Sequence, residues 1–412
     1  MDQKTLIKAK WLLPVSHPPI EDGYLLINDG KITETGTISD LKKQDFHQTI
    51  DCSRHIVMPG LVNAHAHLEL SSLKGKIKEK SFTGWIRALL SETQTWKEED
   101  YRLSVEDGID KLIQSGVTTI GDISRTGLSC EILRQRGIRG VVFLEVLGVD
   151  LLVEGERMDE AKKRLLPMDP DRRVNFGISP HAPYSTSRGL FVKSYQYASK
   201  HDLLVSIHCS ETEEEFEFIQ QGTGEIKTML EDFGLFKEDW SPPGTSPVVY
   251  LSEIGVLKDI IGIHMNIIDE DDIALLSANR VSVVSCPGSN RWFKRKRICP
   301  IDCLLKSNIN VSLGTDSLAS NSSLNLFSEM RYIKEYFPRL SCREILEMAT
   351  IRGARTLGLD KKIGSLEKNK FADIISIELP EDRIDDPEQY IVGNAEKVDL
   401  MMIEGETIFS AV

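Results

Sequence analysis

The sequence predicts an α/β fold: a (β/α)8 barrel of the TIM type with a small β-sandwich formed by the N- and C-terminal segments. Two observations predict it. Eight short runs rich in β-branched residues alternate with helical stretches within residues 56–370, whereas the two ends of the chain show little helical pattern. Eight strand-then-helix units in series are typical of a closed parallel barrel, because right-handed crossovers place every helix outside it.

The eight predicted barrel strands are recognised by their β-branched residues and by the turn residues that bound them. They are IVMPGLVNAHAHLEL, VTTIGDIS, GVVFLEVL, VNFGISPHAP, LLVSIHCSE, DIIGIHMNII, VSVVSCPGSN and NVSLGTD. The segments between them carry apolar residues at helical spacing, as in LSVEDGIDKLIQSG. We therefore expect the barrel over residues 56–370.

The two ends of the chain are expected to pair with each other. Residues 1–55 include YLLINDGKITETG and TIDCS, and residues 371–412 include ADIISIEL and VDLMMIEGETIFSAV, all typical of strands joined by turns. They predict one composite β-sandwich beside the barrel. Residues 241–253, SPPGTSPVVYLSE, are rich in loop-forming residues and predict a long loop over the barrel mouth.

Composition narrows the partners of the protein. The 412 residues are 41% hydrophobic, enough for a large core, and the net charge of −13 argues against the positive field that binders of nucleic acid or anionic membranes use. The N-terminal apolar run is shorter than the roughly 18 residues of a membrane span. We expect a cytoplasmic protein with a small-molecule substrate and with neither nucleic acid nor membrane as partner. A homodimer is the commonest closed assembly for such a chain.

The sharpest local signal is the pair His65 and His67 in the motif NAHAH, at the end of the first predicted strand. Residues two apart on a strand point to the same side, so both imidazoles can reach one metal ion. The alternative is two buried histidines that are held by hydrogen bonds.

Three more histidines and an aspartate favour the metal site. His181, His208 and His264 each fall at the end of a predicted strand, and Asp316 ends the eighth. Because the carboxyl ends of barrel strands converge on one mouth, five of the nine histidines would meet in one pocket. Imidazole with carboxylate suits zinc, iron or manganese. Taken alone, Asp316 would be an ordinary helix N-cap.

The order HxH, His-Cys-Ser-Glu, a lone histidine and GTDSLASN resembles the amidohydrolase superfamily, in particular its deaminase and chlorohydrolase branch, which acts on nitrogen heterocycles. The resemblance spans nearly the whole chain, including PGLVNAHAHLE and SLNLFSEMR. The stretch HAHLELSSLKG followed by SFTGWIRALL is similar to aminodeoxyfutalosine deaminases, enzymes of the futalosine pathway of menaquinone biosynthesis.

The resemblance implies a single divalent metal ion, with zinc as the first choice and iron or manganese as alternatives. Its ligands would be His65, His67, His208 and Asp316, which match the metal ligands of the family. No lysine stands at the end of the fourth predicted strand, where members with two metal ions carry a carboxylated lysine. One metal ion is therefore expected.

The resemblance also implies catalytic roles. Glu211 matches the proton shuttle of the family, His264 and Asp316 match the residues that hold the attacking hydroxide, and His181 matches a substrate contact. A divalent cation lowers the pKa of a bound water from about 15.7 to roughly 7, and general acid-base transfer of the kind assigned to Glu211 is worth about 10²–10⁴ in rate. Taken alone, Glu211 would be a surface glutamate that opens the acidic run ETEEEFE.

Four further residues are candidates for substrate binding. Trp85 could stack on a base, or simply belong to the core. Glu69 and Asp122 lie near strand ends and either line the pocket or cap neighbouring segments. Arg291 opens the basic stretch RWFKRKR, which either binds an anionic group, such as the benzoate of aminodeoxyfutalosine, or is a solvated loop.

The prediction is a metal-dependent hydrolytic deaminase that releases ammonia from an aminated purine nucleoside, with 6-amino-6-deoxyfutalosine as the first candidate. The alternatives on this scaffold are deamination of adenosine, methylthioadenosine, S-adenosylhomocysteine or guanine, and hydrolysis of a chlorinated ring. A non-enzymatic scaffolding relative would lack the metal ligands, and all four are present. The pairing of HxE with PCxxC that marks cytidine deaminases is missing from the sequence, because PCxxC does not occur in it.

Overall fold

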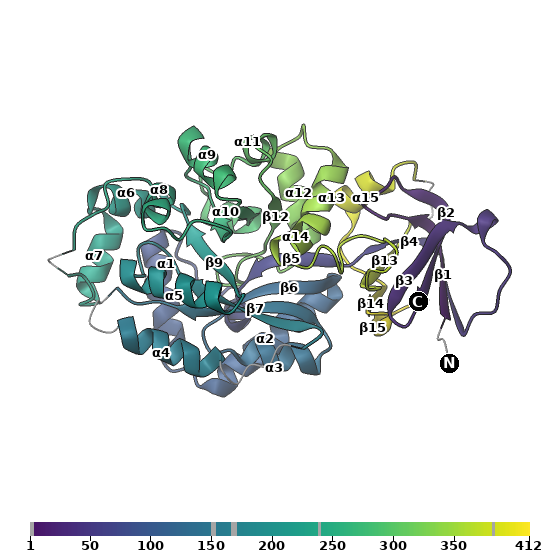
Figure 1. Cartoon of the computed structure of the whole chain (residues 1–412), viewed down its shortest axis with the longest axis horizontal. Coiled ribbons are helices and arrows are strands. Elements are labelled where there is room, and N and C mark those ends of the chain that lie inside the picture. The colour runs from purple at the N-terminus through teal and green to yellow at the C-terminus, as the bar shows by residue number, and fades with distance from the viewer. Residues whose placement is uncertain (1–3, 150–153, 166–170, 238–239, 381–383) are drawn as a thin grey trace.

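The barrel wall consists of eight parallel strands in the order β12-β11-β10-β9-β8-β7-β6-β5 (Figure 1). The structure, a computed structural model, describes residues 4–149, 154–165, 171–237, 240–380 and 384–412. The barrel strands are β5 (Leu61–Ala66), β6 (Val117–Ser124), β7 (Arg139–Val146), β8 (Val174–Pro180), β9 (Leu204–Cys209), β10 (Ile261–His264), β11 (Ser282–Ser285) and β12 (Val311–Leu313). All eight predicted strands are confirmed, and with them the fold class.

The first and last barrel strands meet at their carboxyl ends. The backbone N–H groups of Thr315 and Asp316 donate to the carbonyl of His65 at 3.0 and 3.2 Å, and Ala66 forms a parallel bridge with Asp316. The closure of the barrel therefore brings Asp316 beside His65, although 250 residues separate them in the chain.

Helices surround the barrel wall and cover the apolar outer face of its strands (Figure 1). They are α1 (Phe82–Thr93), α2 (Glu98–Gln114), α3 (Leu128–Gln135), α4 (Glu154–Leu165), α5 (Arg188–Lys200), α6 (Glu213–Gln221), α7 (Glu225–Asp232), α8 (Pro247–Glu253), α9 (Glu270–Ala278), α10 (Pro287–Phe293), α11 (Ile301–Lys306), α12 (Leu326–Tyr336), α13 (Cys342–Met348), α14 (Ile351–Thr356) and α15 (Pro387–Asn394). Within the described ranges no helix is both long and apolar enough to cross a membrane.

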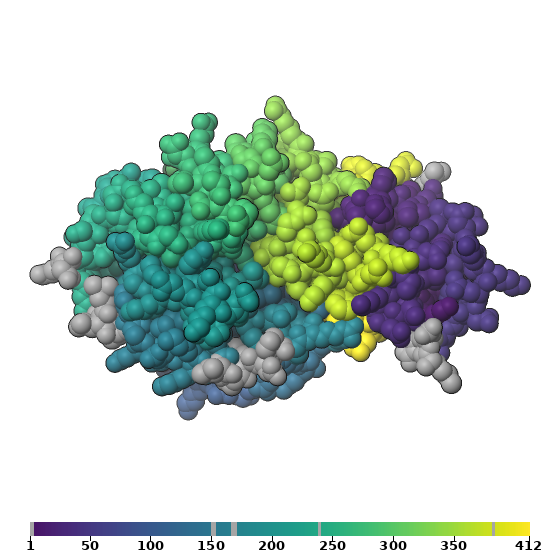
Figure 2. Space-filling view, viewed as in Figure 1, coloured from purple at the N-terminus to yellow at the C-terminus, as the bar shows by residue number. Residues whose placement is uncertain are grey.

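The two ends of the chain form one mixed seven-stranded sheet in the order β15-β14-β13-β4-β1-β2-β3. Its strands are β1 (Lys4–Leu12), β2 (Ile20–Asn28), β3 (Lys31–Thr37), β4 (Gln48–Pro59), β13 (Ile374–Glu378), β14 (Leu400–Ile403) and β15 (Glu406–Ser410). Figure 2 shows both terminal segments at the same end of an elongated molecule. Residues 56–59 pair with β13 in this sheet, so the barrel wall begins at Leu61, later than the predicted run.

A buried ion network ties the barrel to the terminal sheet. Arg139, at the start of β7, is 1% exposed and donates to Asp373 through Nε at 2.7 Å and to Glu404 through Nη2 at 3.0 Å. Asp373 directly precedes β13 and Glu404 follows β14. The carboxylates of Asp373 and Glu404 thus neutralise the buried guanidinium of Arg139.

The predicted loop at residues 241–253 is wrong in its second half, where α8 begins. Ser246 caps this helix by accepting a hydrogen bond from the backbone N–H of Val249 at 3.1 Å, and Pro247 occupies its first turn. Serine and proline are common in loops, but they are also preferred in the cap and in the first turn of a helix. Their composition alone therefore does not separate the two structures.

Candidate metal centre and substrate pocket

The histidines of the first barrel strand end in a buried cluster at the mouth. His65 is 1% exposed, and neither of its ring nitrogens has a hydrogen-bond partner among the described residues. The Nε2 atom of His67 lies 3.2 Å from Nε2 of His208, at the end of β9. Buried polar atoms are normally satisfied, so the free nitrogens of His65 point to a partner that is not part of the chain.

Asp316 offers one carboxylate oxygen to the same cluster. Its Oδ1 lies 3.8 Å from Nε2 of His65 and 3.7 Å from Nε2 of His67. Its Oδ2 accepts hydrogen bonds from the hydroxyls of Ser289 at 2.7 Å and Ser320 at 2.8 Å. The two serines therefore fix the carboxylate so that Oδ1 faces the imidazoles.

The backbone at two of these strand ends is strained. His264 has a φ of +74° and Asp316 a φ of +58°, in the left-handed region that residues other than glycine rarely adopt. Both residues lie at the barrel mouth, one ending β10 and the other following β12. Such strain is concentrated at functional sites, where it aims a side chain at its target.

The donor set fits a divalent cation. One candidate ligand atom each from His65, His67 and Asp316 lies within 4.8 Å of the others, and the same holds for His65, His208 and His264. Burial, and next the charge of His65, lowers the pKa of His67 to about 3, and the pKa of His208 falls well below its ordinary value for the same two reasons. Both imidazoles are therefore neutral at pH 7, which is the form that binds metal ions.

Glu211 lies beside this cluster and not on the surface. It is 6% exposed, its Oε2 lies 3.8 Å from Nε2 of His264, and its Oε1 accepts a hydrogen bond of 2.6 Å from Nη2 of Arg295. Its backbone N–H donates to Glu215 at 2.7 Å. The acidic run ETEEEFE becomes solvent-facing only after the chain enters α6, so the surface alternative for Glu211 does not hold.

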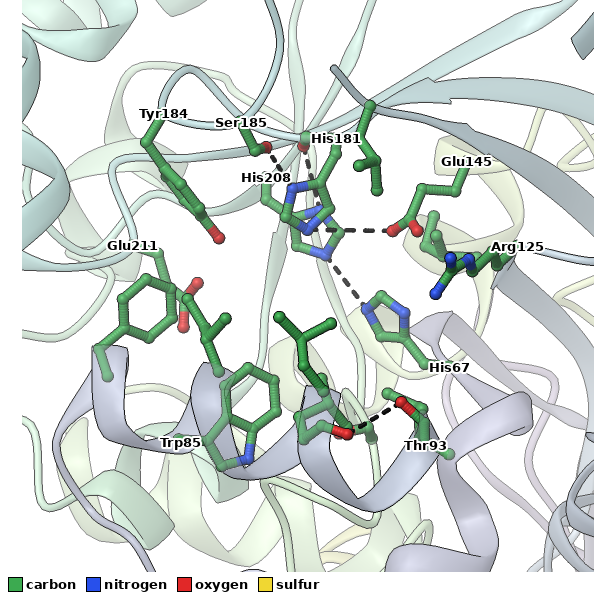
Figure 3. A pocket seen from close by; sticks show the side chains of 18 of the residues that line it. His67, Trp85, Thr93, Arg125, Glu145, His181, Tyr184, Ser185, His208 and Glu211 are labelled. Atoms are coloured by element: carbon green, nitrogen blue, oxygen red, sulfur yellow. Dashed lines mark hydrogen bonds and ion pairs between the residues drawn. The ribbon is translucent and has the colours of Figure 1, made fainter. Parts of the chain in front are cut away.

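His181 and a residue that sequence analysis missed form the opposite wall (Figure 3). The Nε2 atom of His181 lies 3.9 Å from Oε1 of Glu145, and its Nδ1 lies 2.6 Å from the hydroxyl of Ser185. Burial, and then the charge of Glu69, raises the pKa of Glu145 to about 7. Glu145 ends the predicted strand GVVFLEVL, so the strand-end rule that identified the histidines also applies to it.

The pocket above the cluster is largely apolar, with a volume of about 260 Å³. Trp85 lines it, with its ring 6.3 Å from that of Phe82 and 5.6 Å from that of Phe293. The indole Nε1–H donates to the carbonyl of Ala319 at 2.9 Å, which fixes the ring at the pocket wall. Trp85 is therefore both packed against other aromatic rings and accessible to a bound molecule.

Arg291 is not brought to the pocket. Its Nη1 donates to Glu335 at 2.5 Å and its guanidinium lies over the ring of Tyr332, with half of the side chain exposed. The stretch is not a free loop, because its first three residues end α10 and Lys294 then adopts a φ of +58°. This turn directs Arg295 inward, so the basic residue that reaches the site is four positions later than the predicted one.

Glu69 and Asp122 bind the backbone of neighbouring segments. The carboxylate of Glu69 accepts from the hydroxyl of Ser124 at 2.6 Å and from the backbone N–H of Arg125 at 2.9 Å and of Thr126 at 3.0 Å. Asp122 accepts from the backbone N–H of Leu68 at 2.8 Å. Glu69 still lines the pocket, whereas Asp122 lies behind its wall. These contacts match the alternative in which both residues hold loops.

Comparison with known proteins agrees with this fold. A model of the amidohydrolase family matches residues 56–408. A 5-methylthioadenosine/S-adenosylhomocysteine deaminase of Saccharophagus degradans is 30% identical, over 90% of this chain and 83% of that protein. The crystal structure of Helicobacter pylori aminofutalosine deaminase with methylthio-coformycin superposes with a TM-score of 0.87 at 25% identity, over 98% of this chain and 99% of that one.

A second solved structure, an adenosine deaminase from Xanthomonas campestris with bound zinc, gives a TM-score of 0.88 at 24% identity, over 98% of this chain and 93% of that chain. It supports the fold. The family match covers the barrel and most of the C-terminal strands, and the two relatives named above are covered over 83% and 99% of their own length. The predicted hydrolase class is confirmed, and the chain belongs to the amidohydrolase family.

Proposed function

We propose that the protein is a hydrolase that uses one divalent metal ion to deaminate an adenine-type nucleoside, with 6-amino-6-deoxyfutalosine as the first candidate substrate. The observation that carries the proposal is the position of Glu211. Its carboxylate faces His264 at the edge of the histidine cluster, and it opens onto an apolar pocket. A proton-transfer group beside a metal site and a water-poor cavity is the arrangement that ring deamination needs.

The metal ion would be held by His65, His67, His208 and Asp316, with zinc as the first choice for a set of imidazoles and one carboxylate. When bound, such an ion lowers the pKa of water to roughly 7, so that hydroxide is available at neutral pH. The end of β8 carries Pro180 followed by His181 and no lysine, which supports one ion rather than two.

Glu211 would move the protons of the reaction. Its Oε1 is fixed by Arg295, so Oε2 is the oxygen that faces the reacting groups. From this position it can take the proton of the attacking water and pass it to the ring nitrogen beside the carbon that bears the amine. Nε2 of His264 lies 3.8 Å from the same oxygen of Glu211, where it would stabilise the charge that develops on the attacking oxygen. Departure of ammonia then needs one more proton, which the carboxylate of Glu211 can take from the remaining hydroxyl of the tetrahedral intermediate and deliver to the amine.

The choice of substrate rests on two kinds of support. The relatives described above are named for deamination of methylthioadenosine, S-adenosylhomocysteine and aminofutalosine, which share an adenine base. The outer part of the pocket is lined by Leu89, Leu90 and Leu147, which suit an apolar substituent on the sugar. Arg125 also lines the pocket and forms no ion pair among the described residues. It can therefore bind the benzoate carboxylate of the substrate in place of Arg291.

A substrate panel tests the proposal. The purified protein is incubated with 6-amino-6-deoxyfutalosine, S-adenosylhomocysteine, methylthioadenosine and adenosine, and ammonia release is measured together with the mass of each product. We expect ammonia from at least one nucleoside and the highest kcat/KM with 6-amino-6-deoxyfutalosine. Glu211→Gln is the control, because it removes the proton carrier and leaves the shape of the pocket intact.

Two results would contradict the proposal at different levels. A preference for S-adenosylhomocysteine or adenosine would change the substrate and leave the reaction class in place. Release of no ammonia from any of the nucleosides by metal-loaded protein would remove the deaminase proposal itself.

A further inference from the structure

The carboxylate of Glu145 accepts no hydrogen bond from any residue that the structure describes. It lies at the end of β7, with 13% of its side chain exposed, and it faces the pocket on the side of the histidine cluster opposite Glu211 (Figure 3). Placing a carboxylate in a site largely closed to water is costly unless donors surround it. The structure therefore raises the question of which donors Glu145 receives.

The described part of the chain supplies none. No donor among the described residues forms a hydrogen bond with Glu145: Nε2 of His181 lies 3.9 Å away, beyond hydrogen-bond distance, and Arg125 acts on the carboxylate only by attraction at longer range. Glu69, in the same pocket wall, is the contrast, because donors from Ser124, Arg125 and Thr126 occupy its carboxylate. Of these two described carboxylates, Glu145 is the one with both oxygens free for a bound molecule.

Nε2 of His181 is a second acceptor beside the carboxylate of Glu145. The hydroxyl of Ser185 lies 3.2 Å from the carbonyl of Ala182 and 2.6 Å from Nδ1 of His181, and the tautomer with its proton on Nδ1 satisfies both contacts, because the hydroxyl then donates to Ala182 and accepts from His181. In a neutral imidazole that carries its proton on Nδ1, Nε2 is an acceptor. The wall thus presents two acceptors 3.9 Å apart, the carboxylate of Glu145 and Nε2 of His181.

We propose that Glu145 and His181 bind the vicinal hydroxyls of the ribose, with Glu145 as the residue that selects a ribonucleoside. This inference rests on the proposed function. Two neighbouring acceptors need two neighbouring donors, and a vicinal diol supplies one hydroxyl to each. The placement also agrees with the reaction, because the base must lie toward Glu211 and the sugar therefore extends toward the opposite wall, where Glu145 stands.

Deoxy-nucleosides test this assignment directly. The kcat/KM of the wild-type protein is measured with the best ribonucleoside of the panel and with its 2′-deoxy, 3′-deoxy and 2′,3′-dideoxy analogues. We expect the dideoxy analogue to be about 10- to 100-fold poorer than the ribonucleoside, the loss expected when two hydrogen bonds are removed. Glu145→Ala should lower kcat/KM for the ribonucleoside by a similar factor and leave the dideoxy analogue nearly unaffected.

Two further variants separate binding from folding. Glu145→Gln keeps the shape and one neutral acceptor, and is expected to show an intermediate preference for the ribonucleoside. Glu154→Gln is the matched control: it alters a buried carboxylate outside the pocket whose oxygens are occupied by Ser187 and Lys193, so the preference should stay at the wild-type ratio. Thermal unfolding of each variant verifies that it is folded.

The outcomes distinguish this inference from the proposed function. Equal kcat/KM of the wild-type protein for the ribonucleoside and for all three analogues would overturn the role of Glu145 and leave the deaminase proposal standing. A full preference for the ribonucleoside in Glu145→Ala would do the same. If the wild-type protein deaminates no nucleoside, the proposed function fails, and this inference fails with it.

Discussion

Arg295 and Glu211 form a buried ion pair at the edge of the candidate metal centre. The Nη2 atom of Arg295 lies 2.6 Å from Oε1 of Glu211, and the two side chains are 11% and 8% exposed. The guanidinium also lies 4.5 Å from the centre of the Phe293 ring. Arg295 is thereby held from two sides, and it holds the carboxylate with its second oxygen toward His264.

We predict that Arg295→Ala lowers kcat by about 10²-fold, because misplacement of a catalytic group by roughly an ångström costs that much. KM should change little, because Arg295 acts through Glu211. Arg295→Lys should restore part of kcat, since an ammonium keeps the charge but not the planar geometry. Steady-state kinetics on the best nucleoside checks this, and an Arg295→Ala enzyme with wild-type kcat would exclude a positioning role.

We predict that Glu211→Gln retains the metal ion but loses about 10²–10⁴ in turnover, the usual contribution of general acid-base transfer. His65→Ala and Asp316→Ala should instead lose the ion, because they remove ligands. Metal content by mass spectrometry, measured beside turnover for the same samples, separates the two classes. Near-normal turnover in Glu211→Gln would show that another group carries the proton.

Removal of the metal ion should abolish turnover and lower the melting temperature. Without the ion both ring nitrogens of His65 stay buried without a hydrogen-bond partner among the described residues, and an ion that binds only the folded state stabilises it. The measurement is differential scanning calorimetry and activity after dialysis against a chelator, followed by addition of zinc, iron or manganese. Full activity in chelated, metal-free protein would contradict the proposed site.

The buried carboxyl of Glu215 should make stability depend on pH. Burial raises its pKa from 4.5 to about 8, so between these values the folded protein keeps a proton that the unfolded chain has released. The unfolding free energy therefore falls as pH rises through this window, by up to about 1.4 kcal/mol per pH unit for this group. Glu215→Gln cannot ionise and mimics the protonated acid.

Urea unfolding of both proteins at several pH values between 5 and 8, the window set by these two pKa values, checks this prediction. The difference in unfolding free energy between Glu215→Gln and the wild type should shift in favour of the variant as pH rises. Parallel pH profiles would show that Glu215 is already ionised in the folded protein.

Arg139→Met should lower the unfolding free energy by about 3–5 kcal/mol, the cost of breaking a buried ion pair from one side. The substitution leaves the carboxylate of Asp373 buried without its guanidinium, while Glu404 keeps its contacts with Arg172 and Arg173. Arg280→Ala is the matched control, because it breaks the exposed pair with Asp259 and should have a far smaller effect. Chemical denaturation of the three proteins measures the difference. Equal effects of both substitutions would show that the ion network of Arg139 does not stabilise the contact between the barrel and the terminal sheet.

Periodicity was sufficient for most of the fold. The eight barrel strands were predictable because a parallel strand that is covered on both faces must be apolar along its length, as in β6, where all residues are buried. The helix within residues 241–253 was not predictable, because serine and proline, here Ser246 and Pro247, begin helices as readily as they form loops. Only the packing of α8 against α6 and α9 selects the helix.

The candidate site likewise contains residues that the sequence predicted and residues that it did not. His65, His67, His208 and Asp316 were predictable from their positions at strand ends. The sequence did not predict that Arg295, and not Arg291, reaches the site, because the backbone turn at Lys294 decides the direction of the chain there. Glu145 was overlooked because a glutamate at a strand end has no distinguishing motif.

The sequence by itself determined the barrel, the family and the residue types that can bind a metal ion, because these follow from local periodicity and from the rule that strand ends share one mouth. The tertiary structure alone decided which polar atoms are satisfied: the carboxylate of Glu69 is filled by its own loop, whereas that of Glu145 is left open to the pocket. Hydrogen-bond satisfaction depends on atoms brought together from distant parts of the chain, so no local pattern records it.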